Sequence, residues 1–271
     1  MKITIGQYYP ENSPIHRIDP RMKILLLVLF IVGVFFVKNI YGYLISAIFL
    51  GAVIKVSKIP FLFILRGIRG FLFIILFTVI INMLFIRTGY VIFEISFFKL
   101  TLDGVWFSFQ MICRLGFLTI ASSILTFTTS PIQLTHAIES ILKPLQKIGV
   151  PAHDIAMMMT IAIRFIPTLV EEVEKIKKAQ MARGADFDQK GIKKMAKAFI
   201  PILVPLFVSA FRRADELAMA MEARCYRGNV NRTSMNQLKC KFSDYITMFI
   251  GFVFVAMIFI VNNEVWKNFG L

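Results

Sequence analysis

Five apolar runs divide this sequence, and short polar segments separate them. In chain order they cover residues 24–37, 40–56, 70–86, about 104–127 and 245–261. A helix needs roughly 17–25 residues to cross a bilayer, so each run with its flanks is long enough to span once. The pattern predicts five transmembrane helices. The slight break at Lys38 and Asn39 predicts a tight hairpin between the first two.

The polar segment before the first run ends in a helix-start signal. Asp19 can cap the N-terminus of a helix, and Pro20 suits the first helical position. Arg21 and Lys23 follow within one turn. We expect both cations to lie at the lipid headgroups.

Residues 90–102 do not follow the helical pattern. Their side chains are mostly β-branched or aromatic, and apolar and polar positions partly alternate. We therefore predict a short β-hairpin or extended excursion outside the membrane, which ends at Asp103 and Gly104.

The region 128–244 is more polar and predicts three further helices. They cover about 132–148, 153–181 and 192–226. This gives three regions: an arm with four spans (1–127), a polar region of three helices (128–244) and a final span with a tail (245–271). The predicted fold is an all-α integral membrane protein.

Two apolar stretches inside this region, 155–170 and 198–211, are ambiguous. Arg164 and Pro167 interrupt the first stretch, and two prolines interrupt the second. Kinked or charged stretches of this length are typical of helices that lie at the membrane face. A pair of additional spans is the alternative, and the sequence leaves it open.

Composition agrees with a membrane protein, since 57% of the residues are hydrophobic and the mean hydropathy is +0.71. The net charge of +15 comes from Lys and Arg that gather in alternate loops and in 128–244. This distribution follows the positive-inside rule and does not point to a nucleic-acid partner. It predicts that the N-terminus and the three-helix region 128–244 lie in the cytoplasm and that the C-terminus lies outside.

The sequence lacks the common catalytic and nucleotide-binding motifs. It contains no GxxxxGK[ST], GxGxxG, HExxH or GxSxG pattern. The three histidines are far apart, and the three cysteines have no metal-binding spacing. We therefore expect no catalytic residue and no metal ligand. Arg114, within the fourth run, is interpreted as a paired interior charge more readily than as part of a transport path.

Two predicted helices end in the same Ala-Arg step. The first end is Ala182-Arg183-Gly184, and the second is Ala223-Arg224-Cys225, with Gly184 and Gly228 as the predicted stops. One explanation is that each Arg only offsets the helix dipole. The other is that the two ends form a pair directed at one partner, because a guanidinium makes bidentate contacts to carboxylates or carbonyls.

Three segments together resemble a known family. They are Ile15-His16-Arg17-Ile18-Asp19-Pro20-Arg21-Met22-Lys23, Ala182-Arg183-Gly184 and Glu222-Ala223-Arg224-Cys225-Tyr226-Arg227-Gly228. The chain resembles, over nearly its whole length, the transmembrane (T) component of energy-coupling factor transporters, a family that includes the cobalt-transport membrane subunit. The second signature departs from the family's usual Ala-Arg-Gly because Cys225 stands third. This puts in doubt any need for glycine there.

The resemblance implies a scaffold with no substrate site of its own. Such a component holds an exchangeable substrate-binding membrane protein, the S component, and docks two ABC-type ATPases that bind ATP and Mg. Arg183 and Arg224 would each seat in a groove of one ATPase. The residues expected to contact the S component are Met157, Met158, Met159, Pro201 and Pro205.

The implied function is energy coupling for micronutrient uptake in a bacterial or archaeal plasma membrane. Vitamins, cobalt and nickel all stay open as cargo, since selectivity would lie in the S component. Whether the two ATPases are identical, and how many copies assemble, also stays open. The alternative function is a stand-alone secondary transporter, which would require internal repeats and mid-membrane charges.

Overall fold

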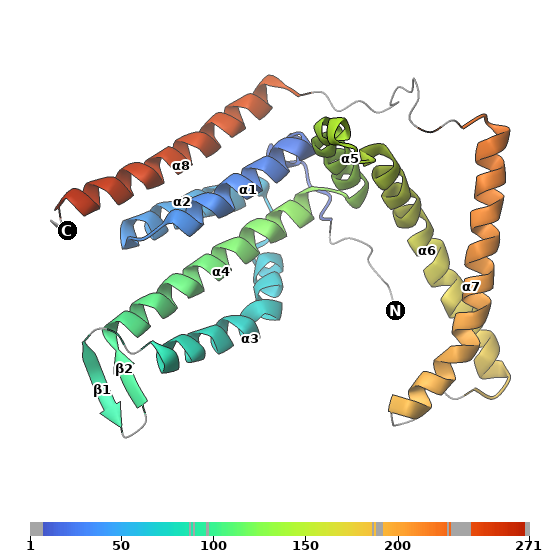
Figure 1. Ribbon diagram of the computed structural model, residues 1–271, viewed down its shortest axis with the longest axis horizontal. Helices are drawn as coiled ribbons and strands as arrows, with labels where there is room; N and C mark the ends of the chain where they lie inside the picture. The colour runs from blue at the N-terminus through green and yellow to red at the C-terminus, as the bar shows by residue number, and fades with distance from the viewer. Residues whose placement is uncertain are drawn as a thin grey trace. The chain divides into compact units, whose positions relative to one another are not determined.

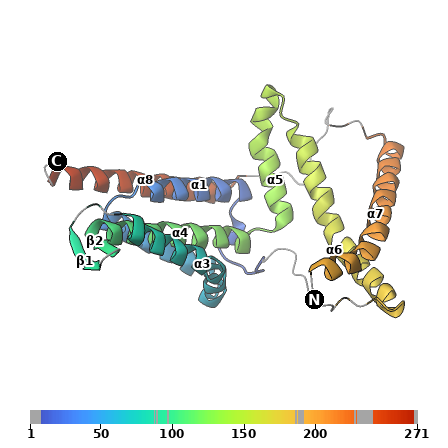
Figure 2. The ribbon, with the colours of Figure 1, turned by 60° about the horizontal axis from the view of Figure 1, so that its bottom comes forward.

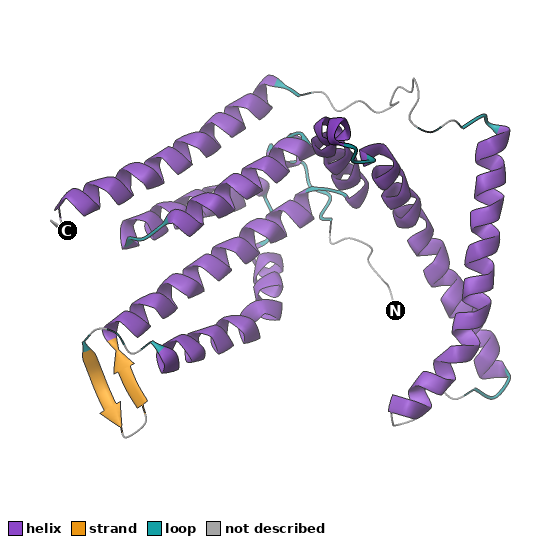
Figure 3. Ribbon diagram, viewed as in Figure 1, coloured by secondary structure: helices purple, strands orange, loops and turns teal. Residues whose placement is uncertain are grey.

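The computed structural model describes residues 8–86, 88, 90–95, 98–185, 187, 192–226, 228 and 240–268. Within these ranges the chain is helical apart from short loops and one two-stranded sheet (Figure 3). The chain forms two compact units. The membrane unit consists of Met1–Ala137 with Gln237–Leu271, and the coupling unit is Ile138–Asn236. The predicted all-α class with a β excursion is confirmed.

The membrane unit is a bundle of long helices. Its elements are η1 Ile15–Arg17, α1 Pro20–Phe36, α2 Ile40–Ser57, α3 Phe61–Phe85, β1 Val91–Ile95, β2 Phe98–Thr101, α4 Leu102–Thr128 and α8 Phe242–Asn268. Helix α1 packs beside both α8 and α4, and α2 contacts the same two helices (Figure 1). Strands β1 and β2 pair antiparallel with Glu94 opposite Lys99, so the predicted hairpin is confirmed.

Helix α1 begins as the sequence predicts, but Lys23 in its first turn does not lie where we expected it. The Asp19 side chain accepts a hydrogen bond from the Arg21 backbone N–H, and Pro20 occupies the first turn. Lys23, in contrast, is buried rather than placed at the headgroups. The expectation was wrong for Lys23 because the carbonyls of His16 and Thr128 and the carboxylates of Asp19 and Asp244 surround it.

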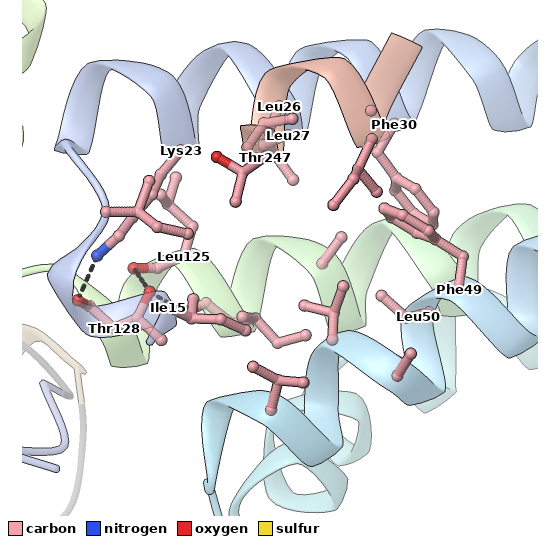
Figure 4. Close-up of a pocket in the computed structure, with 18 of the residues that line it drawn as sticks. Ile15, Lys23, Leu26, Leu27, Phe30, Phe49, Leu50, Leu125, Thr128 and Thr247 are labelled. Atoms are coloured by element: carbon pink, nitrogen blue, oxygen red, sulfur yellow. Dashed lines mark hydrogen bonds between the residues drawn. The ribbon is translucent and has the colours of Figure 1, made fainter. Parts of the chain in front are cut away.

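A core of buried apolar side chains holds α1, α2, α4 and α8 together. The Phe254 ring stacks on Phe30 at a centroid distance of 5.4 Å and on Phe49 at 4.5 Å. Small residues bring α1 and α8 close, since a Cβ on Gly251 would lie 2.6 Å from the Leu26 side chain. An apolar cavity of about 370 Å³ lies beside this core, with Lys23 at one end (Figure 4).

Five helices in the described chain are long and apolar enough to cross a membrane. These segments are Ile40–Ser57, Gly67–Phe85, Leu102–Thr128, Ala152–Ala182 and Phe242–Asn263. The number of candidate spans agrees with the prediction, but one predicted span is missing from the set and one helix that was not predicted to span is included. Helix α1 has only 17 residues, or about 26 Å. Ala152–Ala182, predicted as a coupling helix, qualifies because its first half is apolar.

The coupling unit contains the three predicted helices with small changes at their ends. Helix α5, Pro131–Leu142, crosses from the membrane unit and continues as the 3-10 turn η2, Lys143–Ile148. Helix α6 covers Ala152–Ala182, and helix α7 covers Ile192–Ala223. Both Figure 1 and Figure 2 show a bend in α7, and Pro201 and Pro205 inside this helix account for it.

Candidate functional site

Helices α6 and α7 of the coupling unit pack as an antiparallel pair. Near one end, the Tyr226 hydroxyl donates to the Met157 sulfur at 2.9 Å, which joins the end of α7 to the start of α6. Near the other end, the Phe187 ring lies 6.2 Å from the Phe199 ring, so the residues after α6 contact the start of α7. The two helices therefore run in opposite directions (Figure 1).

A polar contact joins the middle of the two helices. Arg213 donates to one carboxylate oxygen of Glu172 at 3.0 Å, and the Ser209 hydroxyl donates to the other. The Glu172 side chain is mostly buried and that of Arg213 is partly exposed. Both oxygens of Glu172 are therefore used, and a carboxylate with two fixed donors sets the position of one helix along the other.

The antiparallel arrangement separates the two Ala-Arg ends. Arg183 follows the last residue of α6, and Arg224 follows the last residue of α7. Because α6 has 31 residues, the two arginines lie about 45 Å apart, at opposite ends of the pair. The two ends therefore do not form an adjacent pair, and the expectation that they are directed at a partner stays a prediction. Sequence could not reveal this separation, since the direction of packing depends on contacts between distant residues.

The first Ala-Arg end closes with a left-handed glycine. Gly184 has φ +88°, and its N–H donates to the Met181 carbonyl at 3.0 Å. The Ala185 N–H donates to the Gln180 carbonyl at 3.0 Å. These two bonds define a Schellman motif, which satisfies carbonyls that the helix itself leaves unpaired. Gly184 ends the helix as predicted.

The second Ala-Arg end has the same geometry although its third residue is not glycine. Cys225 has φ +55°, and its N–H donates to the Glu222 carbonyl at 2.8 Å. The Tyr226 N–H donates to the Met221 carbonyl at 3.0 Å. Cys225 therefore takes the left-handed position that ends α7, and the predicted stop, Gly228 with φ +69°, lies three residues beyond it. A non-glycine residue in this region is strained by about 1–2 kcal/mol, so the same backbone turn is kept at some cost.

Both ends present the same residues to solvent. Ala182 and Arg183 are exposed at one end, and Ala223 and Arg224 are exposed at the other. An exposed Arg beside a small residue and a fixed turn can enter a groove with its guanidinium forward. The structure thus contains two equivalent helix ends, each with an exposed Arg, that are far apart.

An exposed apolar face runs along α7, within the apolar stretch 198–211 that the sequence analysis singled out. Its members are large hydrophobic side chains at helical spacing: Phe199, Ile200, Leu203, Val204, Phe207, Val208 and Phe211. This face points away from α6, because Ile202, Ser209 and Arg213 lie on the opposite side of α7. The spacing of apolar residues in 199–211 was the available signal.

The predicted S-component contacts divide into exposed and partly buried groups. Pro201 and Pro205 are exposed and flank the apolar face of α7. Met158 is also exposed, whereas Met157 and Met159 are partly buried. Met157 is further engaged with Tyr226, so Met158 is the most accessible member of the methionine cluster.

Arg114 has a structural role in the membrane unit. Its guanidinium donates to the Val37 carbonyl at 3.1 Å and lies 5.8 Å from the centre of the Phe35 ring. Val37 is the residue that caps the C-terminus of α1. Arg114 therefore satisfies a helix-end carbonyl, as expected for a paired interior charge.

Comparison with known proteins agrees with this geometry. A family model described as CbiQ, cobalt transport protein, matches residues 11–235. The chain belongs to the CbiQ family. The matched range includes the Ile15–Lys23 motif and both Ala-Arg ends. The resemblance found in the sequence is therefore confirmed, and the chain is a multi-pass transmembrane component of an energy-coupling factor transporter.

Curated relatives extend over nearly the whole chain. Each is named energy-coupling factor transporter transmembrane protein EcfT. The Thermosediminibacter oceani protein is 50% identical over 98% of this chain and 99% of its own length. The Acidaminococcus fermentans protein is 51% identical over 97% of each chain. The Bacillus subtilis protein is 42% identical over 95% of this chain and 97% of its own length.

Proposed function

We propose that this chain transmits the ATP-driven motion of two ABC-type ATPase subunits to a substrate-binding S component. The observation that carries the proposal is the pair of equivalent Schellman ends, each with an exposed Arg, at opposite ends of one antiparallel helix pair. Two identical elements about 45 Å apart suit two related partners better than a single one.

Each ATPase would receive one helix end. Arg183 would enter a groove of one ATPase, and Arg224 would enter the equivalent groove of the other. The turn at Gly184 or Cys225 fixes the direction of the guanidinium, so little side-chain and backbone freedom is lost on docking. ATP and Mg²⁺ would be bound by the ATPases, and this chain would have no catalytic activity.

The exposed face of α7 would contact the S component. Large apolar side chains in a continuous row are costly in water and mark a protein or membrane surface. Met158, Pro201 and Pro205 extend the surface that an exchangeable partner could use. Movement of α6 and α7 by the ATPases would then change the orientation of the S component.

The proposed orientation in the membrane follows the distribution of Lys and Arg. The N-terminus and the coupling unit would lie in the cytoplasm of a bacterium or archaeon, and the C-terminus would lie outside. The cargo would be a vitamin or a metal ion such as cobalt or nickel, chosen by the S component.

The test is affinity purification of the tagged chain from its native membrane in mild detergent. The double variant Arg183→Glu/Arg224→Glu should lose both ATPases and all transport, and each single variant should lose most of the transport. Lys175→Glu is the matched control, because Lys175 is an exposed cation of α6 with the same charge change. This control should retain the ATPases.

Two outcomes contradict the proposal. If the double variant retains the ATPases and transports normally, the Ala-Arg ends are not the docking elements. If the wild-type chain is purified alone yet transports after reconstitution, a stand-alone transporter is the better description.

A further inference from the structure

Buried polar side chains join three helix ends inside the membrane unit. We define the polar node as Asp19, Lys23, Thr128, Thr129 and Asp244, none of which is more than 7% exposed. They come from the N-terminus of α1, the C-terminus of α4 and the N-terminus of α8. Two members belong to the Ile15–Lys23 motif, for which the proposed function provides no role.

Within the polar node, Lys23 joins the start of α1 to the end of α4. Its ammonium donates to the Thr128 carbonyl at 2.9 Å (Figure 4). It also donates to the Thr129 hydroxyl at 3.3 Å and to the His16 carbonyl at 3.3 Å. These contacts use all three ammonium hydrogens. The positive charge also lies at the C-terminal, negative end of α4, where it is stabilised.

Within the polar node, Asp244 joins the start of α8 to the start of α1. One carboxylate oxygen accepts the Asp19 backbone N–H at 3.1 Å, and the other accepts the Lys241 backbone N–H at 2.7 Å. Asp19 and Lys241 are the residues that precede α1 and α8. A single carboxylate thus caps two helices and lies at the positive ends of both dipoles.

The residues of the polar node lie close in sequence to the two points where the chain leaves and re-enters the membrane unit. The coupling unit is inserted between residues 137 and 237. Thr128 and Thr129 precede the point where the chain leaves the membrane unit, and Asp244 follows the point where it returns. The polar node therefore connects the two attachment points of the coupling unit through the start of α1.

We propose that the polar node is the fixed anchor against which the coupling unit works. This inference rests on the proposed function, since it requires that the ATPases move the coupling unit. A force on that unit acts on the end of α4 and the start of α8. A buried and hydrogen-bonded network resists their separation, so the membrane unit stays one rigid body and the motion is not lost in parting the two helices.

The first test measures substrate transported per ATP hydrolysed by the complete complex in proteoliposomes. Asp244→Asn is nearly isosteric but removes the charge, and Lys23→Met keeps the chain length but removes the donors. Each should leave ATP hydrolysis close to the wild-type rate and lower the transport per ATP by about fivefold or more. The control is Gly33→Ala, whose Cβ would lie 3.2 Å from the Phe254 ring and loosen the α1–α8 contact away from the node.

The control separates anchoring from ordinary stability. Gly33→Ala should lower the thermal midpoint but leave the transport per ATP unchanged. An unchanged ratio in both node variants would overturn the proposal, and so would an equal fall in Gly33→Ala. If wild-type protein binds no ATPase at all, the proposed function fails instead, and the purification experiment above detects that separately.

A second test needs no variant and so does not depend on folding of the mutants. Hydrogen exchange of the wild-type complex is compared with and without ATP turnover. The amides of Asp19 and Lys241, both donors to Asp244, should remain equally protected in both conditions. Faster exchange of both amides during turnover would show that the node opens, which contradicts a fixed anchor.

Discussion

The membrane unit and the coupling unit are stabilised in different ways. In the described part of the membrane unit, four helices share a core of buried aromatic and aliphatic side chains, and the polar node closes one end. In the described part of the coupling unit, the buried apolar side chains are Ala152, Ala156 and Ile202. The α6–α7 pair depends instead on a few polar and aromatic contacts along its length.

This difference indicates which unit is complete without a partner. A unit with a shared core keeps its shape alone, whereas a helix pair with an exposed apolar face has surface left to cover. The coupling unit is therefore the part that we propose to move with its partners, and the membrane unit is the part that we propose to support it.

The largest effect is expected from the core of the membrane unit. Phe254→Ala removes a buried ring that stacks on Phe30 and Phe49, and should destabilise the unit by about 3–5 kcal/mol. Val208→Ala in α7, where the side chain is exposed, should have little effect. Thermal unfolding in detergent measures both. Equal losses would show that the coupling unit has a core of its own.

The next effect concerns the exposed face of α7. Phe207→Glu places a charge in the middle of that face and should weaken retention of the S component about 30-fold, the size expected for a central interface residue. Co-purification against the tagged chain measures this. Met219→Glu is the control, because Met219 is exposed on α7 outside the apolar face. Full retention by Phe207→Glu would mean that the partner binds elsewhere.

A smaller effect compares the two Ala-Arg ends. Cys225→Gly should stabilise the coupling unit by about 1 kcal/mol, because glycine adopts a positive φ without strain. Gly184→Ala should destabilise it by a similar amount, although nothing lies within 4 Å of the added Cβ. Thermal midpoints of the two variants should therefore move in opposite directions. A shift in the same direction would contradict equivalent turns.

The polar contact between α6 and α7 should contribute less. A double-mutant cycle with Glu172→Gln and Arg213→Gln should give a coupling energy of about 0.5–1 kcal/mol, since Arg213 is partly exposed and its charge is screened. Chemical denaturation monitored by a label in α7 measures it. A coupling energy near zero would mean that Glu172 positions the two helices through Ser209 and not through Arg213.

The smallest effect is a pH dependence at His16. Burial lowers the pKa of His16 below 6.5, and the nearby Lys23 charge lowers it further, against opposing effects of the Tyr9 carbonyl and Glu11. Because the folded pKa is depressed, the stability from neutral His16 is present above pH 6.5 and is lost as the pH falls below it. The thermal midpoint should fall more between about pH 7.5 and 5.5 in wild type than in His16→Gln. Parallel falls would remove His16 as the cause.

The sequence by itself determined the elements and their chemistry. Apolar runs and turn residues give the helices and the hairpin, and Asp19 and Pro20 give the start of α1, because these signals act within a few residues. The Ala-Arg repeat could also be found from sequence, since both copies follow a helical pattern.

Only the tertiary structure decided how these elements are used. Lys23 was expected at the headgroups, yet Thr128, 105 residues away, helps to bury it. Arg183 and Arg224 lie at opposite ends because contacts such as Met157 with Tyr226 fix an antiparallel pair. Cys225 holds a turn that favours glycine because the helix end needs those hydrogen bonds. Each outcome depends on contacts between residues far apart in the chain, which local sequence patterns do not specify.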